Sequence, residues 1–511
     1  MAKQGSVWIT ASPGLLAYTI LVLIAALALN GPDAARPVVD ETLVDCAIAK
    51  TIRTDHVHAI HAAEPLPVTR DALWRIVLAF TGAGDVPAVP ALAILFACGA
   101  MLVLLAASVA TVCGAGKSGA GIASLLAATS AGLSLHTVTA LPVALGSLCA
   151  AFALLRHVRS CAGGVPLSLA SAVWIGLAMW TRIEFLVVWL AMWLHAIVSC
   201  IAQRRSVAWA ICQGLSGLLL IALFMAPLLA MNAKAIGIPW PRCPDAPLSL
   251  DVWAVTSAAY ASSSLFQAMK ISIPSAYVKF ADVLLSGPGS VVVLPGLLLV
   301  IGLALRRDDG SRAVRPCLVV CVVALALYGA IIPFVGWSST AFVFSALVPL
   351  AAGAVGTALE WLSTKLPEKR VLRAGLVGVV SLLLLSSALI GQTRGVAAMM
   401  DLGASRAAAL GTLEESGAQV VASDRAGWLL QAGVVAVDLR GETTPEVLAS
   451  LDVYGVWKPT QLATSLHRRG VNALAIWDER HDVLAEQIGG QALGSGAGRP
   501  RLFRLVPRDG S

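Results

Sequence analysis

Charge is scarce in this 511-residue sequence. Asp, Glu, Lys and Arg make up 13% of it, about half of the roughly 25% that soluble domains carry. Hydrophobic residues make up 58% and the mean hydropathy is +0.82, which is more apolar surface than a water-soluble core can bury. This combination excludes a soluble enzyme, a disordered protein, a coiled coil and a small disulfide scaffold. The chain is therefore predicted to be a polytopic membrane protein.

Long apolar runs bounded by charge, Pro or Gly predict the transmembrane helices, each of which needs about 20 residues. A long polar segment, and no small-residue cleavage site, follows the first run, so this run is predicted to be a retained span and not a signal peptide. The fold class is thus an all-α polytopic bundle. Its eleven predicted spans are 13–30, 88–112, 119–135, 138–155, 166–181, 183–200, 207–230, 289–305, 314–333, 341–360 and 372–391.

Basic residues predict the orientation, because cytoplasmic loops are enriched in Lys and Arg. With the N-terminus in the cytoplasm, the cytoplasmic segments hold Lys3, Lys117, Arg156, Arg159, Arg204, Arg205, Arg306, Arg307, Arg312, Arg315, Lys365, Lys369, Arg370 and Arg373. The short loops on the other side, near 136, 182 and 336, contain only Arg182. The net charge of +7 is thus attributed to cytoplasmic loops and not to nucleic-acid binding. An inner (plasma) membrane protein with an extracytoplasmic C-terminus is expected.

Three predicted outer segments, 31–87, 231–288 and 392–511, are too long to be turns, and loops of that size often carry function. In the last segment, strand-like runs alternate with helical patterns, which favours a small α/β domain with a parallel sheet. The expected strands are 419–422, 434–439, 471–477 and 501–506, and the expected helices are 404–416, 444–452, 459–469 and 479–488. Two domains are predicted: a polytopic transmembrane domain, 1–395, and an extracytoplasmic α/β domain, 396–511.

The first outer segment holds three carboxylates, on Asp40, Glu41 and Asp45. An apolar stripe at helical spacing, formed by Val39, Leu43, Cys46 and Ala47, predicts a helix on the membrane surface, and Leu73, Val77 and Phe80 repeat the pattern over 69–80. Carboxylates at the membrane edge can act as a general base on an incoming hydroxyl. The alternative is that acids in a first helical turn merely complement the helix dipole.

Histidines and cysteines give weaker signals. His56, His58 and His61 lie close together, but their spacing matches no known zinc motif, so a solvated polar turn is preferred to a metal site. Eight cysteines lie in or beside spans and are expected to be buried apolar thiols. Cys46 and Cys243, the two in outer segments, are candidates for a disulfide in an oxidising compartment.

Ionisable residues at membrane depth usually mark a site or an ion pair. Arg182 and Glu184 lie between two predicted spans on the outer side. Arg182 either contacts a lipid-linked phosphate, which its planar guanidinium fits, or forms an ion pair with Glu184. His136, at the outer end of another span pair, is a candidate substrate contact, although a lone His in apolar surroundings more often packs and hydrogen-bonds.

Together these motifs resemble GT-C glycosyltransferases, and within them the arabinofuranosyl- and mannosyltransferase-like members. The resemblance rests on Val39-Asp40-Glu41 with the His-rich turn, Glu64-Pro65, Thr69 and Leu73-Trp74 after it, on Thr181-Arg182-Ile183-Glu184, and on 420–427 with 435–441 in the terminal domain. The sequence departs from the family at His136, where relatives often have an acid, and at 336–342 and 232–242.

The resemblance implies an inverting transfer of a pentose or mannose-type sugar from a polyprenyl-phosphate donor. A cell-envelope glycan, lipid or protein would be the acceptor, on the outer face of the membrane. Asp40 would be the general base, Glu41 would orient the acceptor or assist a divalent cation if one binds, and Arg182 would contact the departing phosphate. Asp45, His58, His136 and Glu184 would line the substrate site. The alternatives are a lipid or glycolipid flippase, and an inactive relative acting as an assembly subunit.

Overall fold

The molecule is described from a computed structural model. The structure describes residues 7–29, 40–56, 58, 71–82, 84, 87–130, 132–165, 167–236, 265–285, 298, 300–302, 304, 311–335, 340–365, 370–431, 434–439, 444, 447, 450, 458–477, 480–493 and 500–505. At the ends of several helices, among them the first two residues of the helix that begins at Asp40, the backbone is described and the side chains are not.

Helices make up most of the structure, as the apolar runs predict. In chain order they are α1 (Val7–Leu29), α2 (Asp40–Asp55), α3 (Ala72–Thr81), α4 (Val89–Val112), α5 (Lys117–Ala128), α6 (Leu133–Val138), α7 (Val143–Ala162), α8 (Leu169–Met179), the 3-10 helix η1 (Ile183–Phe185), α9 (Leu186–Ala202), α10 (Val207–Ile236), α12 (Leu265–Leu285), α14 (Ser311–Val335), α15 (Thr340–Lys365) and α16 (Arg370–Glu415).

Eight helical segments among the described residues are long and apolar enough to cross a membrane: Val7–Leu29, Val89–Val112, Val143–Ala162, Ile183–Ala202, Val207–Lys234, Val314–Ile331, Ala341–Lys365 and Val377–Glu415. Where spans were predicted at 119–135 and 166–181, the structure has the shorter helices α5, of 12 residues, and α8, of 11 residues. Most of the predicted span 289–305 lies outside the described residues. The total of eleven therefore stays a prediction, whereas a polytopic helical bundle is confirmed.

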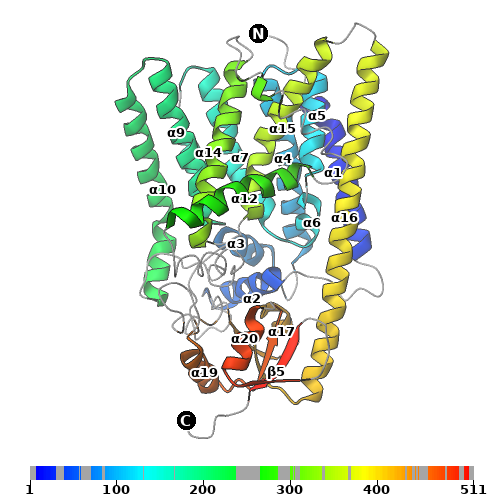
Figure 1. Ribbon diagram of the computed structural model, residues 1–511, viewed down its shortest axis with the longest axis vertical. Helices are drawn as coiled ribbons and strands as arrows, with labels where there is room; N and C mark the ends of the chain where they lie inside the picture. Colours follow the sequence, from blue (N-terminus) through cyan, green and yellow to red (C-terminus); the bar gives the residue numbers. More distant parts are fainter. Residues whose placement is uncertain are drawn as a thin grey trace.

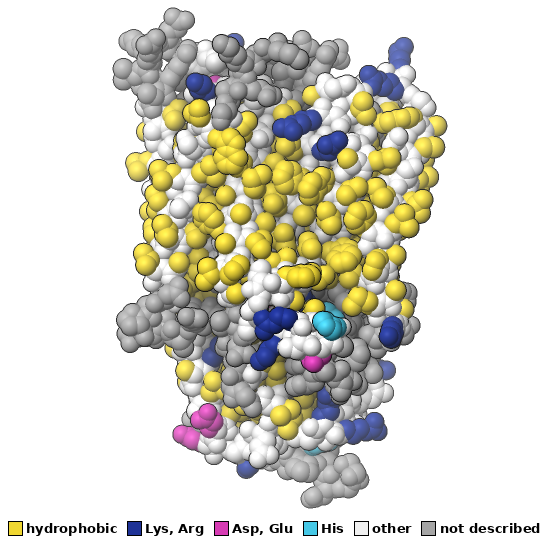
Figure 2. Space-filling model, turned by 180° about the vertical axis from the view of Figure 1, so that it is seen from behind, with side chains coloured by type: hydrophobic (Ala, Val, Ile, Leu, Met, Phe, Trp, Pro, Cys, Tyr) yellow, Lys and Arg dark blue, Asp and Glu magenta, His cyan; other side chains and the backbone are white. Residues whose placement is uncertain are grey.

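Figure 2 shows the surface expected of such a bundle: hydrophobic side chains cover the middle of the helical part, and Lys and Arg lie above and below this band. α15 is the most buried candidate span and packs against α4, α5 and α7. Its Gly356 lies so close to α5 that a Cβ there would clash with the carbonyl oxygen of Gly119. The two glycines let these helix backbones approach more closely than larger residues allow.

Helix α12 lies across the bundle in Figure 1, although its residues belong to the predicted outer segment 231–288. The Tyr277 hydroxyl donates a hydrogen bond of 2.7 Å to the carbonyl oxygen of Val322. Val322 lies in the middle of the candidate span Val314–Ile331, so this part of α12 lies at the depth of the spans. The prediction of a wholly external segment is wrong here, since the apolar side chains of α12 pack on α14 and α15.

The C-terminal part forms a small α/β unit with a five-stranded sheet in the order β2-β1-β3-β5-β4. Its elements are β1 (Val420–Ser423), α17 (Gly427–Gln431), β2 (Val435–Asp438), α19 (Pro459–Arg468), β3 (Ala473–Ile476), α20 (Arg480–Gln487), β4 (Gly490–Ala492) and β5 (Arg501–Leu505). β1 pairs in parallel with β2 and β3, whereas β5 is antiparallel to β3 and β4. The expected α/β class is confirmed, but the sheet is mixed and not purely parallel, because β5 runs antiparallel to β3.

The sheet unit and the bundle are joined by α16, which runs continuously for 46 residues along the side of the molecule (Figure 1). The predicted span 372–391 and the predicted domain boundary at 395/396 fall within this helix, and the predicted helix 404–416 corresponds to its last part, which ends at Glu415. Helices α2 and α3 lie between the bundle and the sheet unit in Figure 1. The two described helices of the first predicted outer segment are therefore enclosed from both sides, and the predicted site residues of α2 lie at this junction.

Candidate active site

Helices α2 and α3 are fixed to each other by a buried ion pair. The Nε atom of Arg75 donates a hydrogen bond of 2.8 Å to Oδ1 of Asp45, and both side chains are almost completely buried. Around the pair, Cys46, Trp74 and Leu78 form an apolar cluster that excludes water from it. Charge-assisted hydrogen bonds of this kind are stronger than neutral ones. Asp45 is thus held by Arg75 in a position that fixes the angle between the two helices.

His58 extends this network. Its Nε2 atom lies 3.0 Å from Nη1 of Arg75, as a hydrogen bond, and the side chain is half-buried. The network of Asp45, Arg75 and His58 thereby includes two of the predicted substrate-site residues. His56 is exposed, and His61 lies outside the described residues.

A second buried ion pair connects α3 to the bundle. The Nη2 atom of Arg182 lies 3.7 Å from Oδ2 of Asp71, a distance typical of an ion pair and longer than an N–H···O hydrogen bond. The Asp71 backbone N–H donates to the Thr181 carbonyl (2.8 Å), and that of Leu73 donates to the Trp180 carbonyl (3.1 Å). These two bonds satisfy amide groups at the start of α3 that a helix leaves without an internal partner.

Asp71 adopts a backbone conformation that is unusual for its residue type. Its φ angle of 55° lies in the left-handed region, which is uncommon outside glycine, although Asp is among the residues that tolerate it best. Asp71 is the N-cap of α3, and the helix begins at the next residue. The ion pair with Arg182 is therefore formed at the N-terminal end of α3.

Arg182 also contacts an aromatic ring: its guanidinium carbon lies 4.6 Å from the centre of the Phe342 ring, at the start of α15. Glu184, two residues further on in η1, is buried as well. The sequence left open whether Arg182 contacts a phosphate or pairs with Glu184. The structure adds Asp71 as an acidic neighbour of Arg182 that was not predicted. Cation–π contacts of this kind contribute about 0.5–2 kcal/mol, so Phe342 helps to orient the guanidinium.

The sheet unit covers the opposite side of α2. Leu43 packs with Leu413 and Trp428, while Val44 and Ile48 pack with Leu430 of α17. Leu43 and Cys46 of the predicted apolar stripe are therefore buried against protein, whereas Val39 lies outside the described residues. α2 is not a helix lying freely on a membrane surface. In α3, by contrast, Phe80 is 88% exposed, as expected for a side chain facing lipid.

His136 lies in α6, between the bundle helices α5 and α7. Its side chain is half-buried, its Nδ1 atom is buried and has no hydrogen-bond partner among the described residues, and burial lowers the pKa of His136 to about 4. Nearby, the Thr42 hydroxyl of α2 donates to the Thr139 carbonyl (2.9 Å). The His136 segment is thus connected to α2, and His136 is neutral at pH 7.

The two predicted catalytic acids, Asp40 and Glu41, form the first turn of α2, and their side chains are not among those described. Glu41 precedes Asp45 by one helical turn. Cys46 is fully buried and Cys243 lies outside the described residues, so the proposed disulfide stays a prediction. The assignment of catalytic roles likewise stays a prediction.

Asp71 and Arg75 were not among the site residues predicted from the sequence. Both are charged residues of the otherwise apolar run 71–80, and both are buried. The signal was available: a helix with one Arg among apolar residues must expose that Arg or pair it. The partner could not be identified, because Asp45 is 30 positions away in the sequence.

The assembled features define a class: a multi-span helical membrane protein in which buried charged residues lie between the bundle and a small α/β unit. No family model and no curated protein sequence matches the chain. Among solved structures it is similar to the crystal structure of ArnT from Cupriavidus metallidurans bound to undecaprenyl phosphate. The TM-score is 0.54 and the identity 13%, over 99% of each chain. ArnT is a GT-C glycosyltransferase, so this likeness supports the expected GT-C fold.

Proposed function

We propose that the protein is a membrane glycosyltransferase that moves a sugar from a polyprenyl-phosphate donor to a cell-envelope acceptor. The observation that carries the proposal is the likeness to ArnT over 99% of both chains, because that structure contains undecaprenyl phosphate. The buried ion pairs at the junction of bundle and sheet unit add to it, since they fix α2 and α3, and with them the proposed base, against the bundle.

In the proposed reaction, the acceptor hydroxyl attacks the anomeric carbon of the donor with inversion. Asp40 removes the hydroxyl proton, the bond from the anomeric carbon to the phosphate oxygen breaks, and polyprenyl phosphate leaves with the bonding electrons. Arg182 stabilises the charge that develops on this phosphate, an effect that is strongest in a site with little water. Glu41 orients the acceptor, or assists a divalent cation if one binds.

The described contacts suggest how the remaining residues contribute. Asp45 and His58, both bound to Arg75, position α2 and thereby Asp40 and Glu41 in its first turn. Asp71 positions Arg182. Glu184 and His136 are proposed to line the substrate site. The sugar is proposed to be a pentose or a mannose-type hexose, as the motif resemblance implies, and the donor is proposed to be used on the outer face of the inner membrane.

Replacement of Asp40 tests the proposal. Membranes containing the Asp40→Asn protein, supplied with a labelled polyprenyl-phosphate sugar, should transfer label roughly 10²–10⁴-fold more slowly than the wild type, which is the usual contribution of a general base. Asp55→Asn, at the exposed opposite end of the same helix, is the matched control and should transfer at the wild-type rate. A wild-type rate for Asp40→Asn would show that the base is a different residue.

The same assay separates a transferase from a flippase. A transferase releases polyprenyl phosphate in step with the glycosylated product, whereas a flippase leaves the glycolipid intact. If the wild-type protein moves the donor across the bilayer without releasing polyprenyl phosphate, the transferase proposal is wrong.

A further inference from the structure

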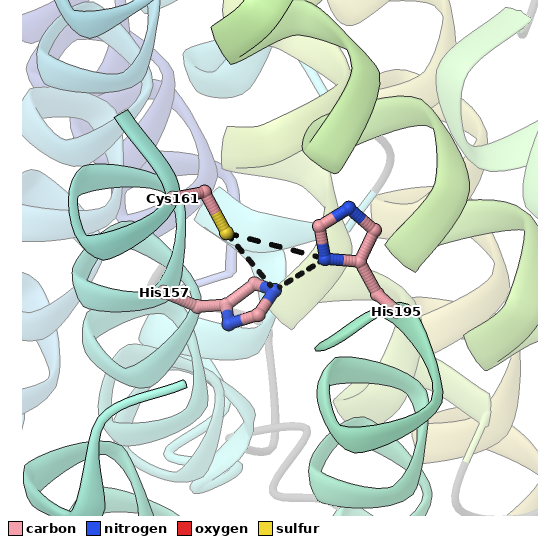
Figure 3. Close-up of side chains that lie close together, drawn as sticks. All are labelled: His157, Cys161 and His195. Carbon is pink, nitrogen blue, oxygen red and sulfur yellow. Dashed lines mark hydrogen bonds between the residues drawn. The ribbon is translucent and has the colours of Figure 1, made fainter. Parts of the chain in front are cut away.

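Three side chains of types that can ligate a metal meet inside the bundle, between α7 and α9. His157 and Cys161 are one turn apart on α7, and His195 faces them from α9 (Figure 3). The Nε2 atom of His157 lies 3.0 Å from Nδ1 of His195. The Cys161 sulfur lies 3.7 Å from the former nitrogen and 4.0 Å from the latter. The three donor atoms thus form a small triangle.

The size of this triangle fits a bound metal ion. With metal–nitrogen distances of about 2.0 Å, a metal–sulfur distance of about 2.3 Å and tetrahedral angles, ligand atoms lie roughly 3.3–3.6 Å apart. The observed separations, 3.0–4.0 Å, bracket these values. Imidazole and thiolate together suit thiophilic ions such as Zn²⁺ and Cu⁺, and not Mg²⁺ or Ca²⁺, which prefer oxygen ligands.

The surroundings also fit a metal site. His157 is fully buried and His195 nearly so, whereas Cys161 is half-buried, which gives an ion a path to the ligands. The Ser199 hydroxyl lies 3.3 Å from Nε2 of His195. An N–H at this nitrogen leaves the lone pair of Nδ1 directed at the triangle, and metal-bound histidines commonly donate their other N–H to such a partner.

A hydrogen bond between the two imidazoles is the simpler explanation of the contact between His157 and His195. It accounts for the separation of 3.0 Å. The single thiol proton of Cys161 can be donated to only one of the two facing nitrogens, whereas the sulfur lies 3.7 and 4.0 Å from them. An imidazole pair in an apolar bundle also gains little from an adjacent thiol, which is a weak hydrogen-bonding group. Convergence of all three donor atoms on one point is what a shared metal ion requires.

We propose that His157, Cys161 and His195 bind one thiophilic metal ion, Zn²⁺ or Cu⁺, which ties α7 to α9. On binding, Cys161 loses its thiol proton to solvent and the two imidazoles coordinate as neutral ligands, so no electron transfer is involved. With Cu⁺ the site is electrically neutral, whereas with Zn²⁺ it keeps one positive charge. The Zn²⁺ ion would also bind a water or another fourth ligand. The ion is structural in this proposal and takes no part in sugar transfer.

Metal analysis of the purified protein is the first test. The full-length protein, isolated in detergent with a tag that binds no metal, is analysed for zinc and copper by mass spectrometry. Wild type should carry one ion per chain. Cys161→Ser and His195→Gln should each lower the affinity for the metal by at least roughly 10–100-fold. This is the loss seen when only a hydrogen-bonding partner of a metal ligand is removed. Cys212→Ser, which alters an exposed cysteine of α10, should keep the ion.

Titration and X-ray absorption complete the test and do not depend on how well the variants fold. Metal-depleted wild-type protein is titrated under reducing conditions, with Zn²⁺ in one arm of the experiment and Cu⁺ in the other. The ion that the protein binds at one per chain is the metal of the site. The absorption fine structure of that wild-type sample should show one sulfur at about 2.3 Å and two nitrogens at about 2.0 Å. Absence of binding in both arms, ligation by oxygen and nitrogen alone, or an unchanged metal content in Cys161→Ser would each overturn the proposal.

Discussion

The ion pair between Asp45 and Arg75 gives the sharpest test of how the junction is held together. Both side chains are almost fully buried and 2.8 Å apart. Removing one partner leaves a buried charge uncompensated, which typically costs about 3–5 kcal/mol, whereas replacing both by apolar groups is often neutral. Asp45→Leu and Arg75→Met should each lower the local unfolding free energy of α2 and α3 by about this amount. The double variant should recover most of the loss.

Native-state hydrogen exchange of the protein in nanodiscs measures this free energy, because it reports the opening of individual elements. A coupling energy of at least about 2 kcal/mol between the two substitutions is expected, within the range known for contacting residues. The ion pair between Arg501 and Asp482 is the control, since it is 3.0 Å long but Arg501 is 51% exposed, and exposed pairs contribute less than about 1 kcal/mol. Substitutions at Asp45 and Arg75 that add to within about 0.5 kcal/mol would refute the reasoning.

Two further predictions concern the bundle. Glu360 accepts hydrogen bonds from the backbone N–H groups of Gly116 (2.7 Å) and Gly119 (2.9 Å) at the start of α5. Glu360→Gln removes the charge at this positive helix end and should destabilise the protein by about 1 kcal/mol, seen as faster hydrogen exchange across α5. Glu414→Gln, on an exposed helix end, should have no such effect. For His136, the folded pKa of about 4 lies below the usual 6.5, so the unfolded chain binds the proton more tightly. The contribution of neutral His136 to the free energy of unfolding should be fully present above about pH 6.5. It should fall by at most roughly 3 kcal/mol as the pH drops to about 4. Thermal unfolding across this pH range should lose that part of its pH dependence in His136→Gln, and an unchanged pH profile would contradict the assignment.

The sequence alone determined the membrane class, because a charge content of 13% and long apolar runs leave no soluble alternative. It also predicted α2, α3 and four of the five strands, since their periodicity is local. Strand β4 was missed: Gly490–Ala492 is too short to show an alternating pattern. No local pattern indicated the antiparallel pairing of β5 with β3 or the packing of α12 on α14.

Pairings across the chain were decided only by the tertiary structure. Arg75 meets Asp45 from 30 positions away, Arg182 meets Asp71 from over a hundred, and His195 meets His157 from 38 positions away. Apolar periodicity specifies which face of a helix is buried, but not which charged or ligating side chain lies opposite. That choice depends on how helices pack, and packing is set by many contacts that no single stretch of sequence contains.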